Sequence, residues 1–163
     1  MLVKIIFYLI SRFKLKKIKI FVCCTEQSGE NICSNILSRM NIDKYQFDGV
    51  CGKQSEIYIT NKIYDLSEFK SIGFFEIILS ISKYLKMIRR LKNYIIKNDY
   101  DLVLTIDSPD FNYNLVKQLR KSNYKNKIIH VVAPTVWAWR SYRARKFANI
   151  FDEIFLLFNF EKK

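Results

Sequence analysis

Short apolar runs alternate with amphipathic segments along most of the chain. The apolar runs cover residues 17–24, 45–50, 101–106, 127–132 and 153–158. A run that is apolar on both faces and stops at glycine, proline or polar residues is typical of a strand buried in a parallel sheet. We therefore expect an α/β fold in which right-handed crossovers connect parallel strands through flanking helices.

Helices are predicted between these strands. One follows the first strand and ends near Met40, and another starts with Pro109 at its first position and continues to about Lys121. Residues 142–150 predict a third, basic helix. The segment 53–72 is mixed, with isoleucines at strand-like spacing and then a helix start predicted within 67–70.

The longest predicted helix begins near Gly73. Its apolar residues recur at helical spacing and predict one buried stripe: Phe74, Ile77, Ile78, Ile81, Leu85, Ile88, Leu91 and Ile95. Phe75, Leu79 and Met87 lie off this stripe and widen the apolar arc. Two interpretations remain open for these three, a helix packed against two neighbours or a patch that contacts lipid.

The length of the chain indicates the size of the domain, and its charge indicates the kind of partner. The chain has 163 residues, half of them hydrophobic, which is enough for one domain with a sizeable core. Its formal net charge of +13 predicts anionic partners such as phosphorylated small molecules or an acidic membrane surface, although a compositional bias of the genome explains the charge equally well. Nucleic acid is not an expected partner, because the cationic residues do not interleave with aromatic ones and no nucleic-acid-binding motif occurs.

Residues 1–16 are expected to form a basic and apolar extension, followed by the domain at 17–163. The apolar part, 2–10, is too short to span a membrane and lacks the small-residue cleavage site of a signal peptide. It is either a surface-lying segment that binds anionic lipid or a frayed terminus.

The cysteines and the histidine predict no metal site, and no cofactor is expected. Cys23, Cys24, Cys33 and Cys51 lack metal-ligand spacing, and they fit reduced, buried side chains of a cytosolic protein. Cys23 and Cys24 should point to opposite faces of their strand. His130 lies within an apolar strand, where a core or supporting role is more common than metal binding.

Polar and charged residues gather where three predicted strands end. The carboxyl ends of parallel strands meet at one edge of a sheet, and ligands bind at that edge in open α/β folds. The candidate site residues there are Glu26, Ser28, Gly29, Asp107, Asp110, Trp137, Trp139 and Arg140. The helix that begins near Ser28 can receive a phosphate or a hydroxyl group at its N-terminus.

Four strings carry a resemblance to a known family. They are SGE at 28–30, IDSPDFN at 106–112, PTVWAWR at 134–140 and LFNFE at 157–161. Together they resemble the N-terminal half of the lipid-A-disaccharide synthases, and the similarity runs from about Lys17 to the end of the chain. The resemblance implies a Rossmann-like parallel sheet that forms the N-terminal half of a GT-B architecture.

The family resemblance also implies an activity. Members are inverting glycosyltransferases that join UDP-2,3-diacylglucosamine to 2,3-diacylglucosamine 1-phosphate (lipid X), release UDP, and work as cytoplasmic proteins peripheral to the inner membrane. By resemblance Asp107 is the catalytic base, which takes the proton of the attacking sugar hydroxyl. Arg140 would bind acceptor phosphate or offset charge on UDP, and Trp137 and Trp139 would pack on sugar faces or acyl chains. Alternatively, Asp107 caps the next helix, as Ser108 could too, and the tryptophans belong to the core.

The chain departs from the family pattern in three places. Thr25 and Glu30 stand where the family usually has Gly and Asp, and only Gly49 and Gly52 remain of a glycine-rich turn. The sequence also stops where the nucleotide-binding domain of the family should begin. We therefore expect a truncated or split enzyme that needs a separate C-terminal chain, with a non-catalytic phosphoglycolipid- or membrane-binding domain and a decaying remnant as alternatives.

Overall fold

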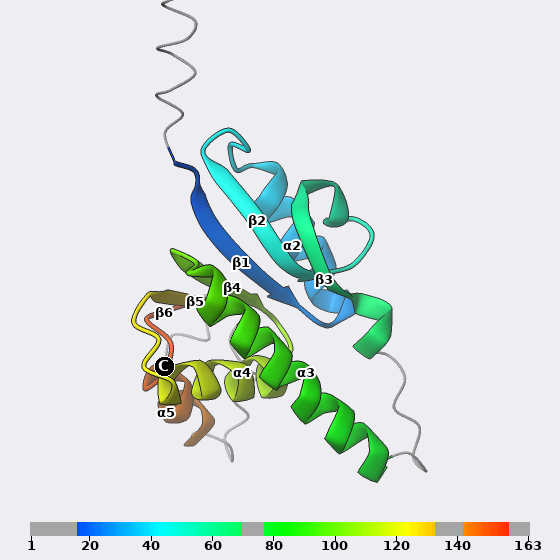
Figure 1. Cartoon of the computed structure of the whole chain (residues 1–163), viewed down its shortest axis with the longest axis vertical. Helices are drawn as coiled ribbons and strands as arrows, with labels where there is room; N and C mark the ends of the chain where they lie inside the picture. The colour runs from blue at the N-terminus through cyan, green and yellow to red at the C-terminus, as the bar shows by residue number, and fades with distance from the viewer. Residues whose placement is uncertain (1–15, 70–76, 133–141, 157–163) are drawn as a thin grey trace, which may run out of the picture.

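The computed structural model describes residues 16–69, 77–132 and 142–156. Within these ranges the strands form one six-stranded sheet in the order β3-β2-β1-β4-β5-β6, with every neighbouring pair parallel (Figure 1). The strands are β1 Ile18–Cys24, β2 Tyr45–Cys51, β3 Ile59–Asp65, β4 Leu102–Ile106, β5 Lys127–Val131 and β6 Glu153–Phe155. The α/β fold with a parallel sheet, predicted from the hydrophobic pattern, is confirmed.

Helices cover both faces of this sheet. They are α2 Gln27–Ser38, α3 Ile77–Asn98, α4 Pro109–Lys121 and α5 Tyr142–Ala148, with short 3-10 turns η1 Glu56–Tyr58 and η2 Leu66–Phe69. Helix α2 lies on one face of the sheet, and α3 and α4 lie on the other (Figure 1). The mixed segment after β2 contains the edge strand β3, and the helix start expected within 67–70 is the single turn η2.

Two hydrophobic clusters, one on each face, hold the layers together. Phe21 and Cys23 of β1 point into the cluster under α3, α4 and α5, whereas Val22 and Cys24 point into the cluster under α2. The opposite orientation predicted for Cys23 and Cys24 is therefore confirmed. All four cysteines are buried and free. Burial raises the pKa of the Cys51 thiol to about 12, and it also raises the pKa of Cys23.

The buried face of α3 differs from the predicted stripe. Ile88, Leu91 and Ile95 are buried as expected, but Ile81 and Leu85 are 54% and 56% exposed. The core side of the helix is rotated toward Tyr84 and Met87, because Tyr84 packs edge-on against Phe111 of α4. The N-terminal half of α3 also extends past the sheet (Figure 1), so none of the described strands covers the side that carries Ile81 and Leu85. Met87 is buried, so the lipid-contact interpretation is wrong for this residue.

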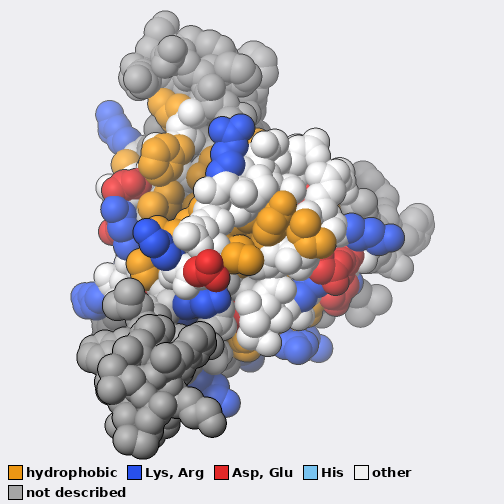
Figure 2. Space-filling model, turned by 90° about the horizontal axis from the view of Figure 1, so that it is seen from above, with side chains coloured by type: hydrophobic (Ala, Val, Ile, Leu, Met, Phe, Trp, Pro, Cys, Tyr) orange, Lys and Arg blue, Asp and Glu red, His pale blue; other side chains and the backbone are white. Residues whose placement is uncertain are grey.

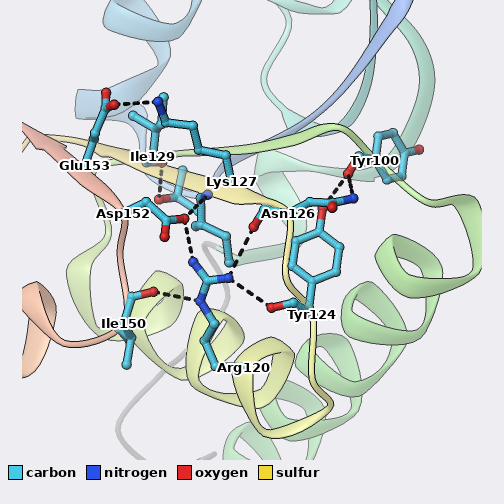
Figure 3. A network of polar contacts seen from close by, with 11 residues as sticks. Tyr100, Arg120, Tyr124, Asn126, Lys127, Ile129, Ile150, Asp152 and Glu153 are labelled. Carbon is cyan, nitrogen blue, oxygen red and sulfur yellow. Dashed lines mark hydrogen bonds and ion pairs between the residues drawn. The ribbon is translucent and has the colours of Figure 1, made fainter.

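Arg120 joins the segments that precede β5 and β6 (Figure 3). Its guanidinium donates to the carbonyl oxygens of Ile150, Tyr124 and Asn126 at 3.0, 2.9 and 3.2 Å, and to the Asp152 carboxylate at 2.6 Å. The same carboxylate accepts the backbone N–H of Ile128 at 2.6 Å. One planar side chain thus fixes the amino ends of two strands.

Basic residues are widely spread on the surface. On the end of the molecule where β1 begins, Lys and Arg side chains are scattered among exposed hydrophobic ones and do not gather into one patch (Figure 2). Among the helices that the structure describes, none is long and apolar enough to cross a membrane.

Candidate active site

The candidate site lies where the chain reverses its direction of travel across the sheet. From β1 the chain winds outward through β2 to β3, then returns through α3 to β4 on the other side of β1. The loops after β1 and β4 therefore diverge to opposite faces, and they leave a crevice at the carboxyl ends of these two strands. The 25–30 and 107–112 segments predicted to share one edge do meet there.

Asp107 is held at this edge by three other elements. Its backbone N–H donates to the carbonyl of Val131 at the end of β5 (2.9 Å), and its own carbonyl accepts the side-chain amide of Asn112 in α4 (2.7 Å). The hydroxyl of Ser28, in the first turn of α2, donates to the Asp107 carboxylate. The backbone of Asp107 is left-handed, with φ of 54°. These contacts fix the carboxylate at the mouth of the crevice.

Gly29 permits this close approach of α2 to the loop after β4. A Cβ atom at this position would lie 3.0 Å from the Cβ of Asp107 and 3.1 Å from the sulfur of Cys24. A larger residue would require α2 or the loop after β4 to shift by a few tenths of an ångström. Gly29 thus contributes to the site by letting α2 pack closely against Asp107.

Asp107 does not cap α4, so that alternative is wrong. Ser108 occupies the N-cap position, and its hydroxyl makes no capping hydrogen bond. The hydroxyl is buried and has no hydrogen-bond partner among the described residues. Ser108 also adopts a left-handed backbone with φ of 46°. The turn from β4 into α4 is therefore built from two consecutive left-handed residues, which is unusual for a serine.

Glu30, one of the departures from the family pattern, faces away from the crevice. Its side chain is 1% exposed, and its two carboxylate oxygens accept the backbone N–H groups of Gly52 and Ser55, both at 2.9 Å. Gly52 must be small, because a Cβ there would lie 2.8 Å from the Glu30 carboxyl carbon. Glu30 and Gly52 together attach the loop after β2 to α2.

A cavity of about 230 Å³ lies beside Asp107. Its floor is apolar and consists of Phe69 from η2, Tyr84 and Met87 from α3, and Phe111 from α4. Its rim carries charge, with Glu26, Glu68, Lys83 and Asp110 among the lining residues. Thr25 and Pro109, which also line it, belong to the same two loops that hold Ser28 and Asp107.

A buried polar pair lies beneath the site. The hydroxyl of Thr105 donates to the carbonyl of Ile129 (3.1 Å) and lies 2.8 Å from Nδ1 of His130, whose ring is fully buried against Phe147 and Phe151. Burial lowers the pKa of His130 to about 4, against the opposing effects of the Val132 backbone and the Asp107 charge. His130 is thus a neutral core residue, as the sequence favoured. No group of three or more potential metal ligands occurs among the described residues.

The predicted site residues fall into three groups. Ser28, Gly29 and Asp107 contact one another at the switch between β1 and β4, and Glu26 and Asp110 line the cavity beside them. Trp137, Trp139 and Arg140 lie outside the described residues. Sequence reasoning missed the aromatic floor of the cavity. Part of this lining was visible in the sequence, because Met87 lies off the main apolar stripe of its helix and Phe111 lies within the IDSPDFN string.

Fold and site together define a Rossmann-like domain with a candidate ligand site at the switch point of its sheet. The family model described as lipid-A-disaccharide synthetase matches residues 20–163, and the chain belongs to this family. It is 41% identical over 145 residues to the lipid-A-disaccharide synthase of Rickettsia canadensis (strain McKiel), a match that covers 88% of this chain and 38% of the relative. The corresponding enzyme of Chlamydia abortus (strain DSM 27085 / S26/3) is 35% identical over 146 residues, covering 88% of this chain and 23% of the relative.

The chain thus spans well under half the length of these relatives. Among solved structures it is similar to a Listeria monocytogenes protein assigned as a UDP-N-acetylglucosamine 2-epimerase, with a TM-score of 0.60 and 15% identity. That match covers 87% of this chain and 40% of the other. At this level of identity the likeness supports the fold.

Proposed function

We propose that this chain supplies the acceptor side of a lipid-A-disaccharide synthase site. The reaction would transfer 2,3-diacylglucosamine from its UDP derivative to lipid X, and UDP would leave. Family membership supports the reaction class. The observation that carries the assignment to this edge is the position of Asp107, a carboxylate fixed at the switch point by contacts from α2, α4 and β5.

In this proposal Asp107 is the general base. A sugar hydroxyl becomes a better nucleophile when a carboxylate within hydrogen-bond reach takes its proton as the new bond forms. Ser28 donates to Oδ2 of Asp107, which leaves Oδ1 to accept from the incoming hydroxyl. The positive ends of α2 and α4 both face this edge, and they favour negative charge there. The chemistry needs no metal or other cofactor from this domain.

The rest of the predicted site belongs to the same proposal. Arg140 would bind the phosphate of the acceptor or offset charge on departing UDP, and Trp137 and Trp139 would pack on sugar or acyl groups. The nucleotide would be held by a C-terminal domain, as in other GT-B enzymes, in the same or a separate chain. We also propose that the protein acts at the cytoplasmic face of the inner membrane, where its positive charge favours anionic lipid.

The test is a substitution that keeps the shape of Asp107. Residues 20–163 would replace the matching segment of the Rickettsia canadensis enzyme, and UDP release would be measured with UDP-2,3-diacylglucosamine and lipid X. We expect Asp107→Asn to slow release by about 10²- to 10⁴-fold, the usual contribution of a general base. Asp43→Asn is the matched control, because Asp43 is exposed in the turn before β2, at the opposite edge of the sheet.

Two results would change the proposal. If Asp107→Asn stays within threefold of the parent, Asp107 is not the base. If the parent releases no UDP but the chain still binds lipid X, the second candidate function, a phosphoglycolipid-binding domain, is favoured. The apolar cavity beside Asp107 is the observation that keeps this second candidate under consideration.

A further inference from the structure

We propose that Asn112 is a positioning residue for the reaction, because it holds the turn between β4 and α4 in the form that presents the Asp107 carboxylate. This inference rests on the proposed function, since it concerns the residue that would act as the base. Asn112 is fully buried and does not line the cavity beside Asp107. The sequence did not predict it as a site residue, although it ends the IDSPDFN string.

The turn from β4 into α4 has a backbone form that needs support. Asp107 and Ser108 are consecutive left-handed residues, with φ of 54° and 46°. Helix α2 begins differently, because the residue before it, Glu26, is extended with φ of −127°. A helix that follows a strand of this sheet therefore does not require the left-handed form. In residues that carry a Cβ atom, such geometry persists only where the surroundings impose it.

Asn112, the fourth residue of α4, provides this support. Its side-chain amide donates to the carbonyl oxygen of Asp107 at 2.7 Å, and its backbone N–H donates to the carbonyl oxygen of Ser108 at 3.0 Å. One residue thus binds both carbonyl groups of the left-handed pair. If the backbone of Asp107 turned to an ordinary conformation, its carbonyl would lose this donor, and leaving a buried acceptor unpaired is costly.

The position uses the donor half of the amide. The acceptor half, Oδ1 of Asn112, is buried and has no hydrogen-bond partner among the described residues. For stability alone a leucine, which has the same branched shape and no unpaired polar atom, would suit this position better. A buried asparagine with an unpaired oxygen is therefore the kind of residue that is kept for a local task, here the hydrogen bond to Asp107.

The backbone of Asp107 determines where its carboxylate lies. The direction of the Cα–Cβ bond follows from the backbone angles, so a change of the left-handed form would move the carboxylate away from Ser28, whose hydroxyl donates to it. A displacement of about 1 Å at a reacting group can slow a reaction about 10²-fold. Asn112 would therefore affect proton transfer without contact to the substrate.

The test is a double-mutant cycle in the chimeric enzyme with Asn112→Leu, which keeps the shape of the side chain and removes its donor. We expect Asn112→Leu to lower kcat for UDP release by about 10²-fold and to leave KM for lipid X within about threefold. In the Asp107→Asn background the same change should lower kcat by less than about threefold, because Asn112 acts only through that carboxylate. Asn35→Leu is the control, since the exposed Asn35 amide of α2 also donates to a carbonyl, that of Asn31 at 3.2 Å.

Amide hydrogen exchange on the 163-residue chain gives a second readout that does not need turnover. The backbone N–H of Asp107 donates to the carbonyl of Val131 at 2.9 Å. Its exchange should become at least about tenfold faster in Asn112→Leu, whereas that of Leu104 within β4 should not change. Asn112→Asp also keeps the shape of the side chain, and its carboxylate cannot donate, so it should behave in the same way in both experiments.

The proposal is overturned if Asn112→Leu leaves kcat or the Asp107 exchange rate unchanged, or if it lowers kcat equally in both backgrounds. Loss of the whole fold in both Asn112 variants, seen as a missing urea transition, would overturn it too, because a positioning role requires that the sheet survives. A parent chimera that releases no UDP, or an Asp107→Asn variant within about threefold of it, would instead reject the proposed function. Faster exchange at Asp107 would then still show that Asn112 holds the turn.

Discussion

The amino and carboxyl edges of the sheet differ in how completely their polar groups are hydrogen-bonded. At the amino edge the connections into β4, β5 and β6 are joined through Arg120 and through Tyr100, whose carbonyl accepts from Tyr124 at 2.6 Å and from Asn126 at 2.8 Å (Figure 3). Four buried side-chain atoms have no hydrogen-bond partner among the described residues. Ser108 Oγ, Asn112 Oδ1 and His130 Nε2 lie at the carboxyl ends of β4 and β5, and Ser55 Oγ lies in the loop that follows β2. None of these four atoms belongs to the connections at the amino edge.

Backbone geometry follows the same division. Left-handed residues occur at both edges, but those at the amino edge are Asp99 and Asn123, which tolerate this conformation. At the carboxyl edge the left-handed residues include Ser108 and Val132, and these residue types rarely adopt this conformation. Strained backbone and unpaired polar groups persist where the surrounding fold imposes them, and they concentrate at functional sites. The contrast therefore supports the carboxyl edge as the working edge.

The largest effect on stability is expected at the amino edge. Arg120→Ala removes four hydrogen bonds from one side chain and should lower the free energy of unfolding by roughly 3 kcal/mol. Arg120→Lys keeps the charge but not the planar fork, so it should recover less than half of this loss. Urea denaturation at pH 7 measures both, with Arg145→Ala, exposed on α5, as the control.

A loss below about 0.5 kcal/mol for Arg120→Ala would show that the amino edge does not depend on this network, and the comparison would fail.

At the carboxyl edge, stability should depend on pH through His130. Its pKa is about 4 in the folded protein and 6.5 as a free side chain. Between these values the unfolded chain binds a proton that the folded chain does not, so stability falls as pH drops from about 6.5 toward about 4. At pH 5 the loss is about 2 kcal/mol relative to pH 7.5. His130 is the single histidine of the sequence, which makes the effect assignable.

The measurement is the free energy of unfolding in urea at pH 7.5 and pH 5.0, for the parent and for His130→Gln. Carboxylates titrate in both proteins, so their contribution cancels in the difference. An equal pH dependence in the two proteins would mean that His130 is not buried as a neutral ring. The contact between the Thr105 hydroxyl and Nδ1 of His130 would then not account for its state.

Much of the fold could be predicted from the sequence because burial on both faces of a strand leaves a local signal. The bounds of β4 and α4 were predicted to within a residue, since Asp101 and Pro109 mark where these elements begin. The rotation of α3 could not be predicted. Tyrosine is neither clearly apolar nor clearly polar, and the half-buried position of Tyr84 depends on Phe111, a residue 27 positions later in the chain.

The site was predictable only to the level of the edge. Ser28 and Asp107 each follow a strand, and parallel topology brings strand ends together, so their approach was expected. The burial of Glu30 was not, because it depends on a loop 22 residues away folding back over α2. The cavity was missed for the same reason, since its lining comes from several separate segments whose side chains meet only in the folded state.

The smallest effect expected has the opposite sign. Ser108→Gly relieves a left-handed backbone, which costs a residue with a Cβ about 1–2 kcal/mol, and removes a buried hydroxyl that has no partner among the described residues. The added freedom of glycine in the unfolded chain offsets about 0.4–1 kcal/mol of this gain. We therefore expect Ser108→Gly to stabilise the protein by roughly 1 kcal/mol in urea.

Asn123→Gly, at φ of 58° on the amino edge, should gain less than about 0.5 kcal/mol, because Asn already tolerates this geometry. If both variants gained equally, strain would not distinguish the two edges. If Ser108→Gly also slowed UDP release in the chimeric enzyme, the strained turn would be shown to hold Asp107 for its role at a cost in stability.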